Sequence, residues 1–445
     1  MRKTLIRICI LQFAFLALLG SPAFAAGQNE SAAKPNKLIV LDMLQPYGTD
    51  FVAPLIPEFE KANGITVIHD IVPEAQMLPK VRTVLTAKDD AYDVILYRGN
   101  LLPALVKSGA LQPLDAYIAK DKAEVAIEDF IAPSLNVFIQ GGKTYGFPTQ
   151  SGGNILFYNK EIFAAAGLAG PPRNGDELEA DAKIIKEKTG KAAFAIPAMR
   201  DSGILVYPWI FMWKLESPKW YDSIKGSWFD ANWQPQVATK EAIAATERWA
   251  RILRNYGPPG IASYGEYECA LDFEQGNLAM FLHNTYWSTE FEDPTKSKVV
   301  GKVGFSVVEA QPGDNRYGTD SPWGYVMSSY SKHKDGAWNF IKWVTSKDTL
   351  LKQVKMGYNQ PFRTSSFESP EFLKMTGPEL GAAVKKAAMV ADTAYKAIIP
   401  EQGEITEIMA VELSSVLSGQ TTADVALKAA NDKILAIMKR DGYIK

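Results

Sequence analysis

Three short apolar runs, separated by two stretches with helical periodicity, constrain the fold of this chain most strongly. Residues 38–41, 65–71 and 94–97 have the length and aliphatic content of buried strands. Between them, residues 51–62 place apolar side chains on one helical face and end at Asn63-Gly64, and residues 75–87 form a second helical stretch. Strand and helix in alternation predict a mostly parallel sheet with helices on its faces, so the expected fold class is α/β.

The same pattern indicates where a ligand would bind. In an open α/β sheet, ligands lie beyond the carboxyl ends of the strands. Here the first and third strands lead into residues 42–50 and 97–100. The candidate binding residues in these two segments are Tyr47, Tyr97, Arg98 and Asn100.

A second α/β unit is expected after residue 141. The chain has 445 residues, which exceeds the usual domain size of about 100–200 residues. Turn residues and short extended chain at 141–148, followed by apolar residues 154–158, indicate a crossing between domains. Residues 207–233 are predicted to form an aromatic loop. Further helices are predicted at residues 180–188, 240–255, 334–344, 379–391, 404–417 and 422–439.

The first 25 residues have the three parts of a secretory signal peptide. Basic residues at the start precede an apolar run at 8–19, and Ala23-Phe24-Ala25 forms a small-x-small cleavage site. The apolar run is shorter than the roughly 18–20 residues that span a bilayer. We therefore expect a signal peptide at residues 1–25, a flexible leader at 26–36, and export to the periplasm.

Charge and cysteine content exclude several classes of protein. Loss of residues 1–25 removes three basic and no acidic residues and moves the formal charge from −2 to −5. Such a chain has no positive field to bind nucleic acid. Only Cys269 remains after cleavage, so no intrachain disulfide can form, and we expect this side chain to be buried as a small apolar group.

No sequence motif supplies a catalytic or cofactor site. The chain lacks a G-x-S-x-G elbow, a phosphate-binding loop, an H-E-x-x-H motif and a G-x-G-x-x-G motif. No two of His69, His283 and His333 are close in sequence, which disfavours a zinc or copper centre. A calcium site built from carboxylates stays open, as does a glycosidase with two facing carboxylates. We expect no cofactor and no metal.

Aromatic residues suggest the chemistry of the ligand. Aromatic residues make up 11% of the chain, and all ten tryptophans lie between Trp209 and Trp343. Aromatic faces stack on the C–H faces of sugars, while amide and charged side chains bind hydroxyl groups. This mixture suits a polyhydroxylated solute. For any single aromatic residue, however, a core position is favoured by about two to one.

Several motifs in fixed order resemble one known family. Gly-Lys-Thr-Tyr-Gly-Phe-Pro at 142–148 and Ile-Leu-Phe-Tyr-Asn-Lys at 155–160 are similar to the G-K-x-Y-G-x-P … L-x-Y-N-K crossing strand of class 1 extracellular solute-binding proteins, which deliver sugars to ABC importers. The resemblance covers nearly the whole mature chain and includes shorter similar segments. They lie at residues 92–94, 109–115, 273–280, 331–341 and 359–363.

The resemblance implies a two-lobed periplasmic-binding-protein fold (type II) that closes on a ligand in the cleft between its lobes. Each lobe would be a mostly parallel sheet flanked by helices. Lobe 1 would comprise residues 37–146 plus about 311–345, and lobe 2 residues 155–310 plus part of 346–445. The hinge would lie near 147–154 and 305–325.

The resemblance also implies further ligand-binding residues. In the family's A-M-x-x-x-G-x-W motif, this chain has Asn284 in place of Gly and Tyr286 in place of Trp, which leaves open whether Tyr286 or Trp287 stacks on the ligand. Asp93 and Asp115 are assigned to structural capping. The other candidates come from the hinge strand, the aromatic loop of lobe 2 and two later segments, and are Gln150, Ser151, Asn154, Tyr207, Trp209, Asp320, Trp323 and Arg363.

The expected function is that of a monomeric periplasmic binding component of an ABC importer. It would capture a sugar, an oligosaccharide or a sugar alcohol and deliver it to the permease subunits in the membrane without catalysing a reaction. Two alternatives remain open: a secreted carbohydrate-active hydrolase, and a binder of an anionic small solute. The second is suggested by Arg98, Arg200, Arg316 and Arg363.

Overall fold

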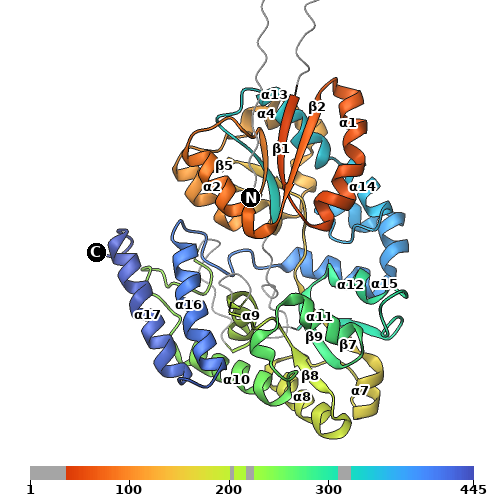
Figure 1. The fold of residues 1–445 in the computed structure, drawn as a ribbon, viewed down its shortest axis with the longest axis vertical. Coiled ribbons are helices and arrows are strands. Elements are labelled where there is room, and N and C mark those ends of the chain that lie inside the picture. Colours follow the sequence, from red (N-terminus) through yellow and green to blue (C-terminus); the bar gives the residue numbers. More distant parts are fainter. Residues whose placement is uncertain (1–36, 201–204, 217–224, 309–321) are drawn as a thin grey trace, which may run out of the picture. The chain divides into compact units, whose positions relative to one another are not determined.

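The computed structural model describes residues 37–200, 205–216, 225–308 and 322–445. The predicted signal peptide, the predicted leader, Arg316 and Asp320 lie outside the described residues. The described residues form a five-stranded sheet and a four-stranded sheet, each flanked by helices, and a short strand pair, β4 (Ile139–Gln140) and β5 (Lys143–Thr144) (Figure 1).

The first sheet contains the three predicted N-terminal strands. Its order is β2 (Thr66–Val72), β1 (Lys37–Met43), β3 (Val94–Arg98), β11 (Trp323–Met327) and β6 (Gly146–Pro148). Strand β1 pairs in parallel with β2 and with β3, which confirms the predicted parallel arrangement. Strand β11 comes from much later in the chain and pairs antiparallel with β3 and β6.

A buried carboxylate joins β11 to the N-terminal strands. Asp42 of β1 is fully buried, and its Oδ2 accepts a hydrogen bond from the Tyr325 hydroxyl at 2.6 Å. The same oxygen lies 2.8 Å from Nε2 of His69 on β2. A buried carboxylate is tolerated only when such partners satisfy it. The three side chains therefore connect β1, β2 and β11.

The helix predicted at residues 51–62 begins later than expected. A turn of π-helix at Tyr47–Val52 and a turn of 3-10 helix at Ala53–Leu55 precede α1 (Ile56–Asn63). Pro54 and Pro57 lie at the starts of the last two segments, where the missing proline N–H costs no hydrogen bond. Gly64, with φ of 62°, ends α1 in the left-handed conformation, as the sequence predicted.

Other helices packed around the first sheet come from both ends of the chain. The predicted helices at 75–87 and 334–344 are confirmed as α2 and α13. In Figure 1 the teal helix α13 lies among the red and orange N-terminal elements. These helices are α2 (Glu74–Thr86), α3 (Leu102–Lys107), α4 (Asp115–Lys120), α5 (Lys122–Val125), α6 (Ala132–Asn136), α13 (Lys334–Val344) and α14 (Lys347–Lys355).

The second sheet is built from the middle of the chain. Its order is β10 (Val303–Ser306), β7 (Asn154–Asn159), β9 (Leu278–Asn284) and β8 (Ala192–Ala195). Strands β8 and β9 are parallel, and β7 is antiparallel to β9 and to β10. The end of β9 and the start of β7 therefore lie at the same edge of the sheet.

The helices associated with the second sheet include most of those predicted after residue 180, and α16 and α17 among them pack on α10 and on each other. Helix α15 starts earlier than predicted and is kinked at Gly377, where φ is 66° and Pro378 follows. Cys269 lies buried in α11, as expected, and burial raises the pKa of its thiol. These helices are α7 (Lys160–Ala166), α8 (Gly175–Thr189), α9 (Val206–Glu216), α10 (Lys240–Tyr256), α11 (Glu266–Glu274), α12 (Trp287–Phe291), α15 (Pro370–Val390), α16 (Gln402–Leu417) and α17 (Ala423–Arg440).

The prediction of an aromatic loop from residue 207 was wrong at its start, because residues 206–216 form helix α9. This helix is apolar on nearly all sides, which is typical of a helix enclosed by other elements. Trp209 and Trp213 of α9 are buried with Trp228, and the ring centroids of the three lie 5.1–6.2 Å apart. Much of the tryptophan content is therefore core.

The chain passes between the two sheets at three places. It leaves β6 for β7 after Pro148, returns from β10 to β11 after Ser306, and continues from α14 to α15 after Lys355. Helix α13 packs on β11 in the first sheet, whereas α15 packs on β7 and β10 in the second. Each sheet thus combines segments that are far apart in the sequence.

Candidate functional site

At the edge of the first sheet, an arginine lies over a tryptophan. Arg98 ends β3 and pairs in register with Trp323, which begins β11. The Arg98 guanidinium carbon lies 4.7 Å from the centroid of the Trp323 ring, within the range of a cation–π contact. Burial raises the pKa of the adjacent Tyr97 to about 12, although Arg82 and Arg98 act in the opposite direction. Trp323 is 5% exposed, so this edge presents a half-buried cation that is fixed over a largely buried ring.

Two other candidates near this edge are enclosed within the first sheet's core. The Tyr47 ring packs against Tyr325 and Tyr358, with centroid distances of 6.4 and 5.3 Å, and burial raises its pKa well above the ordinary value. Asn100 is buried in the short turn that follows β3. Both residues are therefore buried behind the residues exposed at this edge.

At the edge of the second sheet, four candidates come together. Asn154 begins β7 and pairs in register with Asn284, the last residue of β9. The Tyr207 hydroxyl donates to Oδ1 of Asn154 at 2.5 Å. The Asn284 Oδ1 accepts from the Tyr286 backbone N–H at 3.0 Å and also from the side-chain amide of Gln360. Amide and hydroxyl groups from separate segments thus meet at one place.

The hinge candidates lie where the crossing segments touch one another. Ser151 is buried, its hydroxyl donates to the Pro361 carbonyl, and its N–H donates to the Gln360 carbonyl at 3.3 Å. Gln150 is half-buried beside it. From the α14–α15 crossing, Asn359 Nδ2 donates to Ser288 Oγ of the second sheet's helices at 2.9 Å. These contacts fix the path of the chain between the two edges.

The tryptophan candidates are less accessible than Tyr286. Trp209 is fully buried, and its indole N–H donates to Thr246 Oγ1 at 2.7 Å. Trp287 is 7% exposed, and its indole N–H donates to His283 Nδ1 at 3.2 Å. Tyr286 is half-buried, and burial, reinforced by nearby negative charges, raises its pKa. Of the two residues left open by the sequence, Tyr286 has the ring that a solute can reach.

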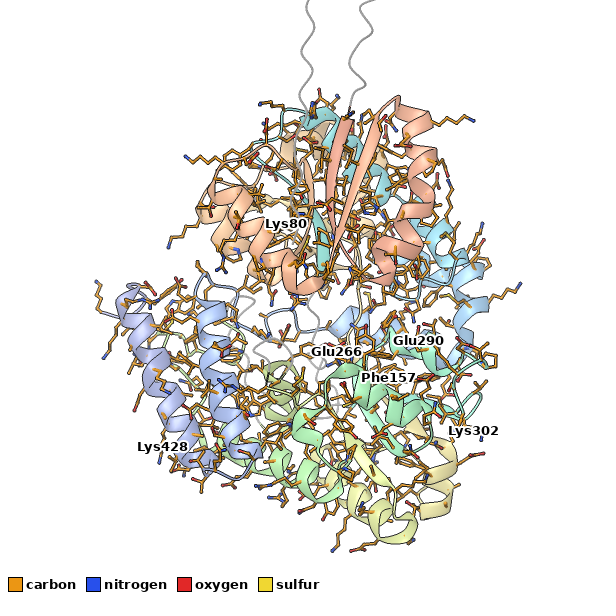
Figure 2. The ribbon with its side chains drawn as sticks, in the orientation of Figure 1. Lys80, Phe157, Glu266, Glu290, Lys302 and Lys428 are labelled. Carbon is orange, nitrogen blue, oxygen red and sulfur yellow. The ribbon has the colours of Figure 1, made fainter. Side chains whose placement is uncertain are left out.

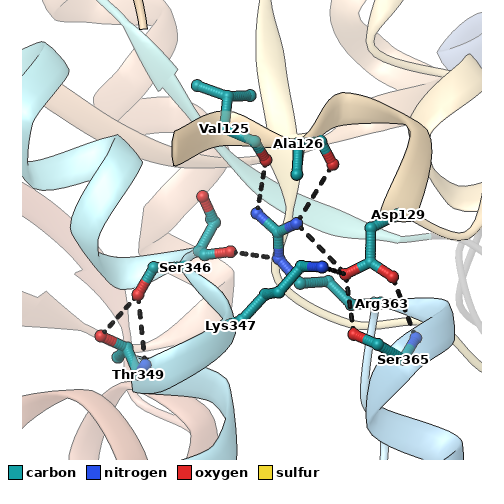
Figure 3. A network of polar contacts seen from close by, with 9 residues as sticks. Val125, Ala126, Asp129, Ser346, Lys347, Thr349, Arg363 and Ser365 are labelled. Carbon is teal, nitrogen blue, oxygen red and sulfur yellow. Dashed lines mark hydrogen bonds and ion pairs between the residues drawn. The ribbon is translucent and has the colours of Figure 1, made fainter. Parts of the chain in front are cut away.

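The guanidinium of Arg363 is occupied by structural contacts (Figure 3). Its side chain is 1% exposed, and its nitrogens donate to the carbonyl oxygens of Thr345 at 2.7 Å, Val125 at 3.0 Å and Ala126 at 3.3 Å. Burial lowers its pKa to about 10, against the opposing effect of Asp129. Arg363 therefore holds together the ends of α5 and α13 and the crossing before α15.

Asp93 and Asp115 have structural contacts, as expected, but neither caps a helix, because α4 and α13 have no side-chain cap hydrogen bond. Asp93 accepts hydrogen bonds from the Ile39 N–H at 2.8 Å and from the Ser331 hydroxyl at 2.6 Å. Asp115 accepts one from the Thr144 N–H at 3.3 Å. Neither carboxylate belongs to the two edges described above.

Two polar residues of the second edge were missed as ligand-site candidates. His283 precedes Asn284 on β9, and its Nε2 lies 3.6 Å from Oε1 of Glu266, the first residue of α11. The sequence showed His283 only as an isolated histidine. No motif marks Glu266, because a carboxylate at the start of a helix is a common stabilising feature.

Among the described residues, no group of three or more His, Cys, Asp or Glu side chains is arranged to hold a metal ion. In the same ranges, no helix combines the length and apolar character needed to cross a membrane.

The family model for bacterial extracellular solute-binding proteins matches residues 44–349, more than half of the chain. The protein therefore belongs to this family, whose members bind solutes outside the cytoplasm.

Individual relatives align with this chain along most of their length. A Brucella abortus (strain 2308) binding protein is 28% identical over 389 residues, which cover 86% of this chain and 88% of that protein. The mannitol-binding protein of Pseudomonas aeruginosa is 24% identical over 410 residues, with 87% and 90% covered. An ABC transporter solute-binding protein of Agrobacterium vitis S4, solved with bound D-mannitol, matches with a TM-score of 0.78 at 25% identity and covers 92% of this chain and 100% of its own. The expected two-lobed α/β fold is confirmed.

Proposed function

We propose that this protein captures a sugar or sugar alcohol in the periplasm and delivers it to the permease of an ABC importer. The names of two relatives support a sugar alcohol in particular, because one is a mannitol-binding protein and another was solved with D-mannitol. The protein would act as a monomer, without cofactor and without catalysis. The signal peptide at residues 1–25 would direct its export.

The observation that carries this proposal is the pairing of aromatic rings with amide and hydroxyl groups at the two sheet edges. Arg98, held over the Trp323 ring, supplies donors on one edge. Asn154, Asn284 and Tyr286 supply amides and a ring on the other. Polyols carry hydroxyl groups that both donate and accept hydrogen bonds, along a C–H backbone that suits aromatic faces.

We propose that the two sheets and their helices are the lobes of a hinged trap. Lobe 1 would comprise residues 37–146 plus about 311–345, and lobe 2 residues 155–310 plus part of 346–445. The hinge would lie near 147–154 and 305–325. Sheet membership supports this division, because β11 joins the first sheet and β7 to β10 form the second. The cleft between the lobes would hold the ligand and close on it.

We propose that some of the candidate residues touch the ligand directly and that the others lie behind the surface of the cleft. Tyr286 would stack on the ligand, Trp323 would hold the Arg98 guanidinium in place, and Asn154, Asn284 and Arg98 would bind the ligand's hydroxyl groups. The other candidates would shape the cleft from behind or complete it. They are Tyr47, Tyr97, Asn100, Gln150, Ser151, Tyr207, Trp209, Trp287, Asp320 and Arg363.

The proposal is tested by titrating the mature protein with neutral polyols, mono- and oligosaccharides and sugar acids, followed by intrinsic tryptophan fluorescence and calorimetry. We expect saturable one-to-one binding of a sugar or sugar alcohol. Failure of every sugar and polyol to bind would contradict the proposal. Release of reducing ends from oligosaccharides would favour the hydrolase alternative, and tight binding of a sugar acid would favour the anionic-solute alternative.

A further inference from the structure

Glu266 carries an accessible carboxylate beside the second edge. It is the first residue of α11, and Figure 2 labels it. Its side chain is 42% exposed, and within the described residues its nearest polar contact is His283 Nε2 at 3.6 Å, which is longer than a hydrogen bond. The carboxylate therefore keeps its capacity to accept hydrogen bonds from a ligand.

A relay of fixed side chains orients this carboxylate. The Trp287 indole can only donate, so its 3.2 Å contact makes His283 Nδ1 the acceptor and places the imidazole proton on Nε2, which faces Glu266. The His283 ring is held in place, since it stacks on Phe281 at 5.4 Å with an interplanar angle of 8° and lies 6.2 Å from the Tyr207 ring. The imidazole N–H dipole is thus aimed at the carboxylate.

The positive charge of Arg98, at the edge of the first sheet, also acts on Glu266. Burial acts to raise its pKa, but His283 and the positive charge of Arg98 outweigh it, so the pKa of Glu266 lies below its ordinary value. The carboxylate is consequently ionised at neutral pH.

Glu266 is connected to the residues already placed at the second edge. His283 precedes Asn284 on β9, and its ring neighbour Tyr207 donates to Asn154. Glu266 is thus linked, through the His283 and Tyr207 rings, to Asn154 at the second edge. Asn284 points to the opposite face of β9 from His283.

We propose that Glu266 is a specificity residue of the ligand site that accepts hydrogen bonds from hydroxyl groups of a neutral polyol and rejects sugar acids. This inference rests on the proposed function. An ionised carboxylate accepts from hydroxyl donors and repels a ligand carboxylate, so attraction and rejection come from the same group. Arg98 would supply the complementary donors. His283 would be a positioning residue that acts through Glu266.

The test compares D-mannitol with its carboxylate analogue D-mannonate, using calorimetry on the mature protein. Glu266→Gln keeps the shape of the side chain and removes its charge. We expect it to weaken D-mannitol binding about ten- to hundredfold, the range of hydrogen bonds to charged groups, and to reduce the preference for mannitol over mannonate. Glu407→Gln, on the exposed face of α16, is the matched control and should change neither quantity.

The positioning role of His283 is tested by a double-mutant cycle. We expect His283→Gln to weaken mannitol binding in the wild-type background and to have little further effect when Glu266→Gln is already present. Equal losses in both backgrounds would mean that His283 acts independently of Glu266 and would overturn its assigned role.

The outcomes separate this inference from the proposed function. If the wild-type protein binds no polyol or sugar, the proposed function is wrong. If it binds mannitol but E266Q matches E407Q in affinity and selectivity, the role of Glu266 is wrong and the proposed function stands. Should E266Q not fold, Glu266→Asp retains the charge one methylene further back. It should weaken mannitol binding while still rejecting mannonate, and unchanged mannitol affinity would overturn the inference.

Discussion

Replacement of Arg363 by methionine should destabilise the protein strongly and leave ligand affinity almost unchanged. The side chain is 1% exposed and donates to three carbonyl oxygens, so methionine would fill much of the space while leaving the Thr345 and Val125 oxygens without this donor. The Ala126 oxygen would keep its hydrogen bond from the Asp129 N–H at 3.0 Å. Sequence reasoning had assigned this residue to the ligand. The variant therefore distinguishes a structural from a binding role.

The expected loss follows from the partners of the guanidinium. Two buried carbonyls that lose their donor cost about 1–2 kcal/mol each. The contact with the Phe130 ring, 3.9 Å from the guanidinium carbon, adds about 1 kcal/mol. Asp129 is not left isolated, because Ser365 and Lys347 also contact it. We therefore expect a decrease in the free energy of unfolding of about 3–5 kcal/mol.

Urea denaturation measures this loss, and D-mannitol titration below the unfolding transition measures binding. Arg363→Lys is the matched variant, since it keeps the charge but cannot reach three carbonyls in the planar geometry of arginine; we expect a smaller loss of about 2 kcal/mol. A change in stability below about 1 kcal/mol for Arg363→Met would refute the structural role. A tenfold fall in affinity of the folded variant would instead support the binding role inferred from sequence.

Three further predictions concern single side chains. Trp209→Ala should lower the free energy of unfolding by about 3–5 kcal/mol in urea denaturation, because the buried indole packs among other tryptophans; a loss below 1 kcal/mol would contradict the core assignment. Tyr286→Ala should weaken D-mannitol binding about tenfold by calorimetry, through loss of ring contact, whereas Tyr286→Phe should bind like the wild type; equal affinities in all three proteins would exclude stacking by this ring. Burial, followed by the charge of Glu177, raises the pKa of Asp181 to about 6, so the folded state binds this proton more tightly than the unfolded state and stability falls as the pH rises from about 4 to about 6. Asp181→Asn should therefore melt at a higher temperature than the wild type above about pH 6 and show no advantage below about pH 4, and a constant difference across this range would contradict the shifted pKa.

Periodicity in the sequence was sufficient to locate the regular elements of the fold. The apolar run at 38–41 and the helical face at 334–344 appear in the structure as β1 and α13. Helix α9 was missed because it is surrounded by other elements, so it has no polar face and gives no amphipathic signal. Aromatic enrichment there indicated packing rather than a loop.

Residues of the candidate site could be predicted only where a strand end or a family-like motif pointed to them. Arg98 was named because it directly ends a predicted strand, whereas Asn154 was named from the resemblance of the hinge strand to the family motif. The partners of Arg363 are backbone carbonyls distant in sequence, and no residue pattern encodes them. The approach of Glu266 to His283 is a tertiary contact that is equally invisible in one sequence.

The position of β11 has a consequence for the order in which the protein can form during synthesis. This strand lies between β3 and β6, so the first sheet cannot be completed until residues 323–327 have left the ribosome. Contacts between such distant segments slow folding, because a long loop must close before they form. For most of its synthesis the nascent chain is therefore unable to reach its final structure.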